Sequence, residues 1–173
     1  CMGNSYSDLV GAKLLGCHKK TDANAIYWRR QANIRDISEI TMVYIAKGGI
    51  KFVFENRQII ASKGDLVFID SGKLIERIPV PGTPISYFFT QFIPVGVNGQ
   101  LSYKETGLPE VTTVSNQKIV IKWLDELFAY YLTREPGWCQ ASSIRLLQII
   151  QTLAPEQDRE AVPTDGPDDR NTE

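Results

Sequence analysis

The sequence has very few of the side chains on which metal and covalent catalysis depend. It contains one histidine, His18, and an odd number of widely spaced cysteines, at positions 1, 17 and 139. One histidine cannot supply the histidine pair or triplet of a usual catalytic metal site, and the adjacent Cys17 completes no common ligand set. No Gly-x-Ser-x-Gly elbow or glycine-rich phosphate loop is present. We therefore expect no metal, no cofactor and no catalytic residue.

Excess charge and long apolar runs are also missing. The 19 basic and 20 acidic residues leave a net charge of −1, which gives no electrostatic attraction to nucleic acid or to a membrane. No run approaches the roughly 20 apolar residues of a membrane span. The N-terminus also lacks the basic and then apolar segments of a secretion signal. The odd cysteine number suits a reducing compartment, so we expect a cytoplasmic protein with no membrane partner.

The most informative stretch is 64–72, Gly-Asp-Leu-Val-Phe-Ile-Asp-Ser-Gly. Two turn signals flank an apolar run of four residues, which predicts a strand buried on both faces. Similar short strands, separated by glycine, proline or polar breaks, are expected at 41–46, 50–54, 58–61 and 85–93. Strands this short and evenly spaced favour a barrel closed on itself, because closure removes exposed edges.

The periodicity changes after Ser115. Apolar residues then recur at helical spacing up to Leu132, with Ser115 or Asn116 as the N-cap, and a second helix is expected from Trp138 to Leu153. The 173 residues suit one core of ordinary size. We divide them into an N-terminal arm over 1–24, a β-barrel over 25–113, a helical pair over 114–154, and a linker or disordered tail over 155–173.

The spacing of 64–72 resembles the second motif of the cupins. That motif has a glycine, a strand, and then a Pro-x-Gly turn followed shortly by a metal-ligating histidine. Here Asp70 occupies the proline position and Ile75 the histidine position. The resemblance implies a cupin-like barrel that keeps the scaffold without the metal chemistry, which suits a sensor or binding domain better than an oxidising enzyme.

Further features occur in a recognisable order along the chain. They are a strand and glycine break over 43–49, the strand opened by 64–66, an aromatic strand ending in 90–92, and two antiparallel helices that carry 123–132 and 144–153. This order resembles the N-terminal regulatory domain of the AraC family of bacterial transcription regulators. In that family the barrel binds an effector, often a small organic molecule, the helices dimerise, and a second domain with two helix-turn-helix motifs binds DNA.

The resemblance implies a fold class and a set of partners. The fold is expected to be mainly β with C-terminal helices, a cupin-like β-barrel of the jelly-roll type followed by two antiparallel α-helices. The expected partners are a small-molecule effector and a second copy of the chain, with DNA contacted only through a separate domain that is absent from this chain.

An effector pocket needs apolar walls with a few polar groups inside. Tyr44, Tyr87 and Gln91 are the polar or amphipathic members of the expected strands, whereas the resemblance implies a role for Trp28 and Arg30, at the entry to the first strands, and Glu76 lies near the position of the missing histidine. The candidates are Trp28, Arg30, Tyr44, Glu76, Tyr87 and Gln91. Tyr87, Phe89 and Gln91 alternate, so they share one face of their strand. Arg30 is suited to pair with an anionic group of an effector. The competing interpretation of each candidate is a core residue or a solvated surface position.

The apolar stripes of the two helices are wider than one contact with a barrel needs. On the second helix, the residues expected to form a dimer interface are Leu146, Ile149, Ile150 and Leu153. Leaving them in water would expose a larger apolar patch than soluble monomers usually tolerate. The alternative is a monomer in which the first helix covers the second completely.

We therefore expect the effector-sensing and dimerisation domain of an AraC-type regulator, with a metal-free barrel that binds a small molecule. One alternative is a free-standing, metal-independent cupin enzyme such as a sugar epimerase or isomerase. Enzymes of that kind usually need a histidine or tyrosine acid–base pair in the barrel, whereas His18 lies before the first expected strand. The other alternative is a barrel whose only task is oligomerisation.

Overall fold

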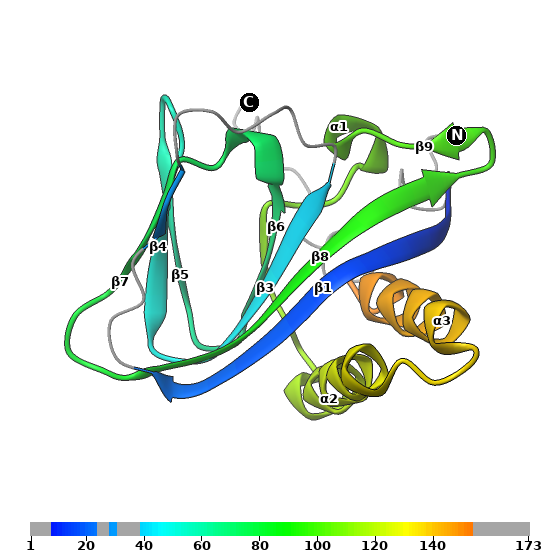
Figure 1. Ribbon diagram of the computed structural model, residues 1–173. Helices are drawn as coiled ribbons and strands as arrows, with labels where there is room; N and C mark the ends of the chain where they lie inside the picture. Colours follow the sequence, from blue (N-terminus) through cyan, green and yellow to red (C-terminus); the bar gives the residue numbers. More distant parts are fainter. Residues whose placement is uncertain (1–7, 24–27, 31–38, 154–173) are drawn as a thin grey trace, which may run out of the picture.

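Two antiparallel β-sheets and two long helices make up most of the fold, seen in a computed structural model that describes residues 8–23, 28–30 and 39–153 (Figure 1). The strands are β1 (Leu9–Ala23), β2 (Trp28–Arg29), β3 (Ile40–Lys47), β4 (Gly49–Val53), β5 (Gln58–Ser62), β6 (Asp65–Asp70), β7 (Glu76–Pro79), β8 (Ile85–Gly96), β9 (Gly99–Gln100) and β10 (Val111–Thr113). The helices are the 3-10 turn η2 (Ser71–Lys73), α1 (Tyr103–Thr106), α2 (Gln117–Thr133) and α3 (Trp138–Gln151).

The large sheet has the strand order β1-β8-β3-β6-β10, with β9 attached to β8, and the small sheet has the order β2-β7-β4-β5. Figure 1 shows the small sheet on one side of the large sheet, and α2 and α3 on its other side. The two sheets enclose one apolar core, and the helices close a second core on the outer face of the large sheet. The predicted fold class, mainly β with a cupin-like barrel and C-terminal helices, is confirmed.

Strands β3, β6 and β8 are covered on both faces. Almost all of β3 and β6 is buried, which explains their nearly continuous apolar sequences, whereas β8 is buried on one face and partly buried on the other. In β6, Leu66 and Phe68 belong to the core under the helices, whereas Val67 and Ile69 belong to the core between the sheets. All four are at most 1% exposed. The sequence-based prediction of a strand with two buried faces at this position is confirmed.

The longest strand, β1, lies inside the segment that we expected to be an N-terminal arm. It pairs with β8 from Leu9 opposite Gly96 to Ala23 opposite Ile85. Its register shifts at three places, and its last residues are polar and exposed, so its sequence has no regular alternation. Residues 9–23 are therefore an integral edge strand of the large sheet, and the first strand begins well before the position expected from the sequence.

The helices begin and end close to the predicted positions. The side chain of Asn116 caps α2 by accepting a hydrogen bond from the backbone N–H of Ile119. The helix ends at Arg134, whose positive φ of 49° is a left-handed C-cap. Gly137, with φ of 88°, supplies the second left-handed position of the turn before α3. In this turn glycine avoids the steric cost that a Cβ would bring.

The four residues expected to form the dimer interface lie in the core of the chain itself. Leu146, Ile149, Ile150 and Leu153 are each at most 2% exposed. They pack with apolar side chains of α2 and of the outer face of the large sheet. The expectation that they present a surface to a second subunit is wrong, because α2 and the large sheet, including β1, leave no such area in water. The homodimer itself stays a prediction.

Two remaining expectations concern the ends of the chain and the membrane. The linker or tail over 155–173 lies outside the described residues. In the described part of the chain, no helix has both the length and the apolar character needed to cross a membrane.

Truncating a buried residue of α3 should destabilise the fold. Leu146→Ala removes a completely buried side chain, so the free energy of unfolding should fall by about 2–5 kcal/mol in urea denaturation. Ile144, which is 54% exposed on the same helix, is the matched control. Ile144→Ala should change the free energy of unfolding by less than about 0.5 kcal/mol. If Leu146→Ala kept full stability, the packing of α3 on its own chain would be refuted.

Candidate functional site

A cavity of about 190 Å³ lies between the two sheets at the end of the barrel that carries η2. Its lining residues are Trp28, Arg30, Glu39, Thr41, Ser71, Leu74, Arg77, Phe89 and Gln91. The small sheet contributes Trp28 from β2 and Arg77 from β7, which lie opposite each other in the register. The large sheet contributes Thr41 and Gln91, which are also direct cross-strand neighbours. Both sheets therefore form its walls.

The face of the large sheet inside the barrel changes from apolar to polar toward this end. Successive inward pairs on β3 and β8 are Ile45 with Tyr87, Val43 with Phe89, and Thr41 with Gln91. Gly16 of β1 leaves room for the last of these, since a Cβ at that position would lie 3.3 Å from Oε1 of Gln91. The cavity thus has an apolar floor and polar groups near its mouth, which is the usual composition of a small-molecule site.

The guanidinium of Arg77 is the most unusual group in the cavity. Its Cζ lies 4.4 Å from the centre of the Phe89 ring and 5.2 Å from that of Trp28. Its Nε is buried and has no hydrogen-bond partner, and no carboxylate of the described residues lies within ion-pair distance. Burial lowers the pKa of Arg77, and the nearby Tyr87 partly offsets this change. An arginine nevertheless stays protonated, so the group is a cation for which the described residues provide no anionic partner.

Arg30, by contrast, has a structural role. Its Nη2 donates hydrogen bonds to the backbone carbonyls of Ser71 and Gly72, and so it ties β2 to η2. The same turn is held by Asp70, whose carboxylate accepts from the N–H of Gly72 at 3.3 Å. The hydroxyl of Ser71 is 2.6 Å from that of Thr41. These contacts fix the polar rim of the cavity.

Glu39 is the one carboxylate among the described lining residues. It is partly buried, and this burial raises its pKa. Its side chain makes no ion pair with an arginine of the described chain. Among the described residues, the cavity therefore has one arginine that binds backbone carbonyls, one arginine without an anionic partner, and one carboxyl group.

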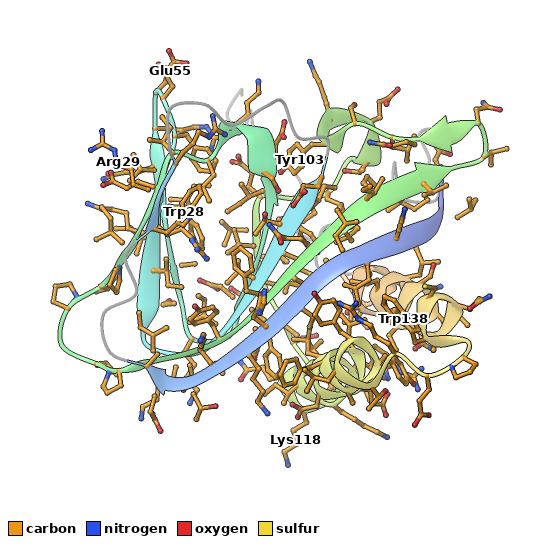
Figure 2. The ribbon with its side chains drawn as sticks, viewed as in Figure 1. Trp28, Arg29, Glu55, Tyr103, Lys118 and Trp138 are labelled. Carbon is orange, nitrogen blue, oxygen red and sulfur yellow. The ribbon has the colours of Figure 1, made fainter. Side chains whose placement is uncertain are left out.

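The structure brings together three of the six candidate residues. Trp28, Arg30 and Gln91 line the cavity, and Tyr87 faces the barrel core next to it, where it is 5% exposed. Figure 2 shows Trp28 on the barrel side of the small sheet and the adjacent Arg29 on its outer side. Because Arg29 is paired with Glu76, that glutamate belongs to the outer face as well.

The two remaining candidates do not line this cavity. Tyr44 is 1% exposed and packs in the core under the helices. Neighbouring residues of a strand face opposite ways, so Val43 faces the inside of the barrel and Tyr44 does not. Glu76 faces outward, whereas the next residue, Arg77, faces the cavity. Arg77 was not among the predicted residues. The only signal for it in the sequence is that it is basic and follows Glu76, and the sequence does not reveal which of the two faces the barrel.

The described residues bring no three His, Cys, Asp or Glu side chains together in a group that could hold a metal ion. His18 lies on β1, is exposed, and does not line the cavity. Its ring centre is 6.4 Å from that of Phe89 and 6.5 Å from that of Tyr131. The residues that line the cavity offer hydrogen bonds, a cation and aromatic surface.

Comparison with known proteins adds little to this description. No protein-family model matches the chain. No curated protein matches it either. Among solved structures, the chain is similar to the Clostridium difficile EutQ protein at 18% identity, over 49% of this chain and 53% of that one, with a TM-score of 0.31. The match thus spans about half the length of EutQ, and a likeness at this level carries no functional argument. The strand topology itself defines a cupin-like barrel domain with a small internal cavity.

The two arginines of the cavity should respond differently to substitution. Arg77→Met removes a buried cation without a partner and keeps the ring contacts, so the free energy of unfolding should stay within about 1 kcal/mol of the wild type or rise. Arg30→Met leaves two carbonyls of η2 without their charged donor and should cost about 1.5–3 kcal/mol. Urea denaturation measures both. Equal losses in the two variants would show that Arg77 is a structural residue.

Proposed function

We propose that this chain is the effector-sensing and dimerisation domain of an AraC-type transcription regulator, and that its barrel cavity binds a small organic molecule without a metal. DNA binding belongs, in this proposal, to a separate domain. The order of strands and helices supports the family, and the composition of the cavity supports the ligand.

The observation that carries the proposal is that two strands connect the cavity to the helices. Alternate residues of β3 and β8 face opposite ways: Thr41 and Phe89 line the cavity, while Met42 and Phe88 pack in the core that holds α2 and α3. A ligand that shifts or rigidifies these strands from the inside therefore acts directly on the packing of the helical pair. Close-packed cores transmit such shifts because they have little free volume. This is the connection that a sensor needs.

The composition of the cavity favours binding over turnover. An epimerase or isomerase moves protons between two groups placed around the substrate. The titratable groups among the described lining residues are Glu39 and two arginines, and an arginine does not act as a proton donor or acceptor near neutral pH. Tyr87 lies below the cavity and burial raises its pKa. This set supports a protein that holds its ligand unchanged.

Ligand binding should be measurable as a thermal shift. A compound present at about 100 times its Kd stabilises the native state by about 2.7 kcal/mol, which corresponds to roughly 5–10 °C for a chain of this length. Panels of small carboxylates, amines, sugars and neutral aromatics should include binders. The shift should persist after dialysis against EDTA, and the compound should be recovered chemically unchanged.

The matched variants test the place of binding. Gln91→Trp and Leu74→Trp fill the cavity and should abolish the shift, whereas Val97→Trp, at a position 80% exposed on the β8–β9 turn, should retain it. Urea denaturation shows whether each variant is folded. If no class of compound binds to the wild type, or if the bound compound is converted to a product, the proposed function is wrong.

A homodimer through the outer surface of the helical pair belongs to the same proposal. Large apolar side chains remain exposed there, with Leu132 64% and Ile144 54% exposed. Sedimentation at micromolar concentration should give twice the chain mass of 19.4 kDa. The double variant Leu132→Ser, Ile144→Ser should give the monomer mass while its circular dichroism spectrum stays that of the wild type, because neither side chain is in the core. A wild-type monomer at high concentration would remove the dimerisation role.

A further inference from the structure

We propose that the ligand of the cavity is a small organic monoanion, whose carboxylate binds the guanidinium of Arg77 and whose apolar body lies against Phe89 and Leu74. This inference rests on the proposed function, in which the same cavity binds a small molecule, and it specifies the chemical class of that molecule. It follows from the state of Arg77, from the engagement of the other arginines, and from the size of the cavity.

Arg77 differs from the other arginines of the described chain in having a buried donor without a partner. Arg57 and Arg145 form ion pairs with Glu110 and Glu126. Arg30 and Arg134 donate to backbone carbonyls. Arg29 is on the exposed outer face of the small sheet. Arg77 alone lines a cavity with a buried Nε that has no acceptor.

Arg77 is partly buried, and its Nε is completely buried without a hydrogen-bond partner. Partial burial removes water from the charge, and this loss destabilises the folded protein unless an acceptor replaces the water. The rings of Phe89 and Trp28 offset part of this cost through cation–π contacts. Such contacts occupy the face of a guanidinium and leave its N–H groups, which lie in its plane, for an acceptor. A carboxylate matches this edge with two parallel hydrogen bonds. A bound carboxylate would therefore supply the acceptor that the described residues do not provide for Nε of Arg77.

The remaining lining residues limit the ligand to one negative charge and a small body. Arg30 already binds two carbonyls, so a second anionic group would find no free cation there and would face the carboxyl group of Glu39. The cavity of about 190 Å³ is smaller than the roughly 300–1,000 Å³ typical of sites for drug-sized ligands. A hydroxyl or carbonyl on the ligand can bind Thr41, Ser71 or Gln91 at the rim. Cations are disfavoured by Arg77.

The test compares pairs of compounds that have nearly the same shape, of which one carries a negative charge and the other is neutral. Benzoate with benzamide, and cyclohexanecarboxylate with its carboxamide, are titrated into the full chain by calorimetry or ligand-observed NMR at pH 7 in a buffer of low anion content. Each carboxylate should bind at least about 10-fold more tightly than its amide, because a charge-assisted bidentate pair is worth more than about 1.4 kcal/mol. Inorganic sulfate is titrated in the same way, and it should bind more weakly than either carboxylate, since it has no apolar part.

Variants show whether Arg77 makes the difference. Arg77→Met should remove the preference for the carboxylate over the amide. Arg77→Lys should retain part of this preference, since lysine keeps the positive charge but cannot form the two parallel hydrogen bonds of a guanidinium. Arg29→Met is the matched control on the outer face of the small sheet and should bind as the wild type does. In the wild type, the Nε–H resonance of Arg77 should shift when the carboxylate is added, and this measurement does not depend on the folding of any variant.

The outcomes separate this inference from the function on which it rests. If amides bind as tightly as carboxylates and Gln91→Trp abolishes both, the cavity is a small-molecule site and the anionic class is wrong. If the carboxylate preference survives Arg77→Met, or the Arg77 resonance does not move, the assigned residue is wrong. If sulfate binds as tightly as the carboxylates, the site recognises charge alone and the organic ligand class is refuted. If no compound of any class binds, the proposed function fails as well.

Discussion

The covering of β3, β6 and β8 on both faces is the constraint on which the rest of the structure depends. Each of these strands must place apolar side chains toward the small sheet and toward the helices at the same time. Neither covering layer can be removed without exposing a complete sheet face, and for this reason the barrel and the helical pair form one structural unit. The period of two along a strand then determines which residues line the cavity and which pack against α2 and α3.

This arrangement also explains where the cavity lies. Along the inner face of β8 the side chains change from Tyr87 to Phe89 to Gln91, and on β3 the last inward residue before the rim is Thr41. Shorter and more polar side chains fill less of the barrel at that end. η2, held by Arg30 and capped by Asp70, forms the rim. At the position where the cupin motif has a proline, Asp70 thus caps a turn, and at the ligand-histidine position Ile75 contributes no ligand.

The environment of Arg77 is not the one that would make the fold most stable. A core designed for stability alone would have an apolar residue or a paired charge at this position. Instead, the guanidinium is held between aromatic rings with one donor unsatisfied. Local departures of this kind, where the other arginines of the described residues are engaged or solvated, are typical of binding sites.

The sequence by itself determined the order of elements, because turn residues, short apolar runs and a change to helical spacing are local signals. Its six pocket candidates, two of them chosen through the family resemblance, included Trp28, Arg30 and Gln91, and it offered Asn116 as one of two possible N-caps of α2. It did not reveal β1, whose bulges and polar end hide the alternation. Only the tertiary structure decided that Tyr44 faces the helices, that Arg77 rather than Glu76 faces the cavity, and that the apolar stripe of α3 is buried by its own chain. The physical reason is the same in each case: a one-residue change of register exchanges the two faces of a strand, and the partner that covers a helix is set by contacts between residues far apart in the sequence.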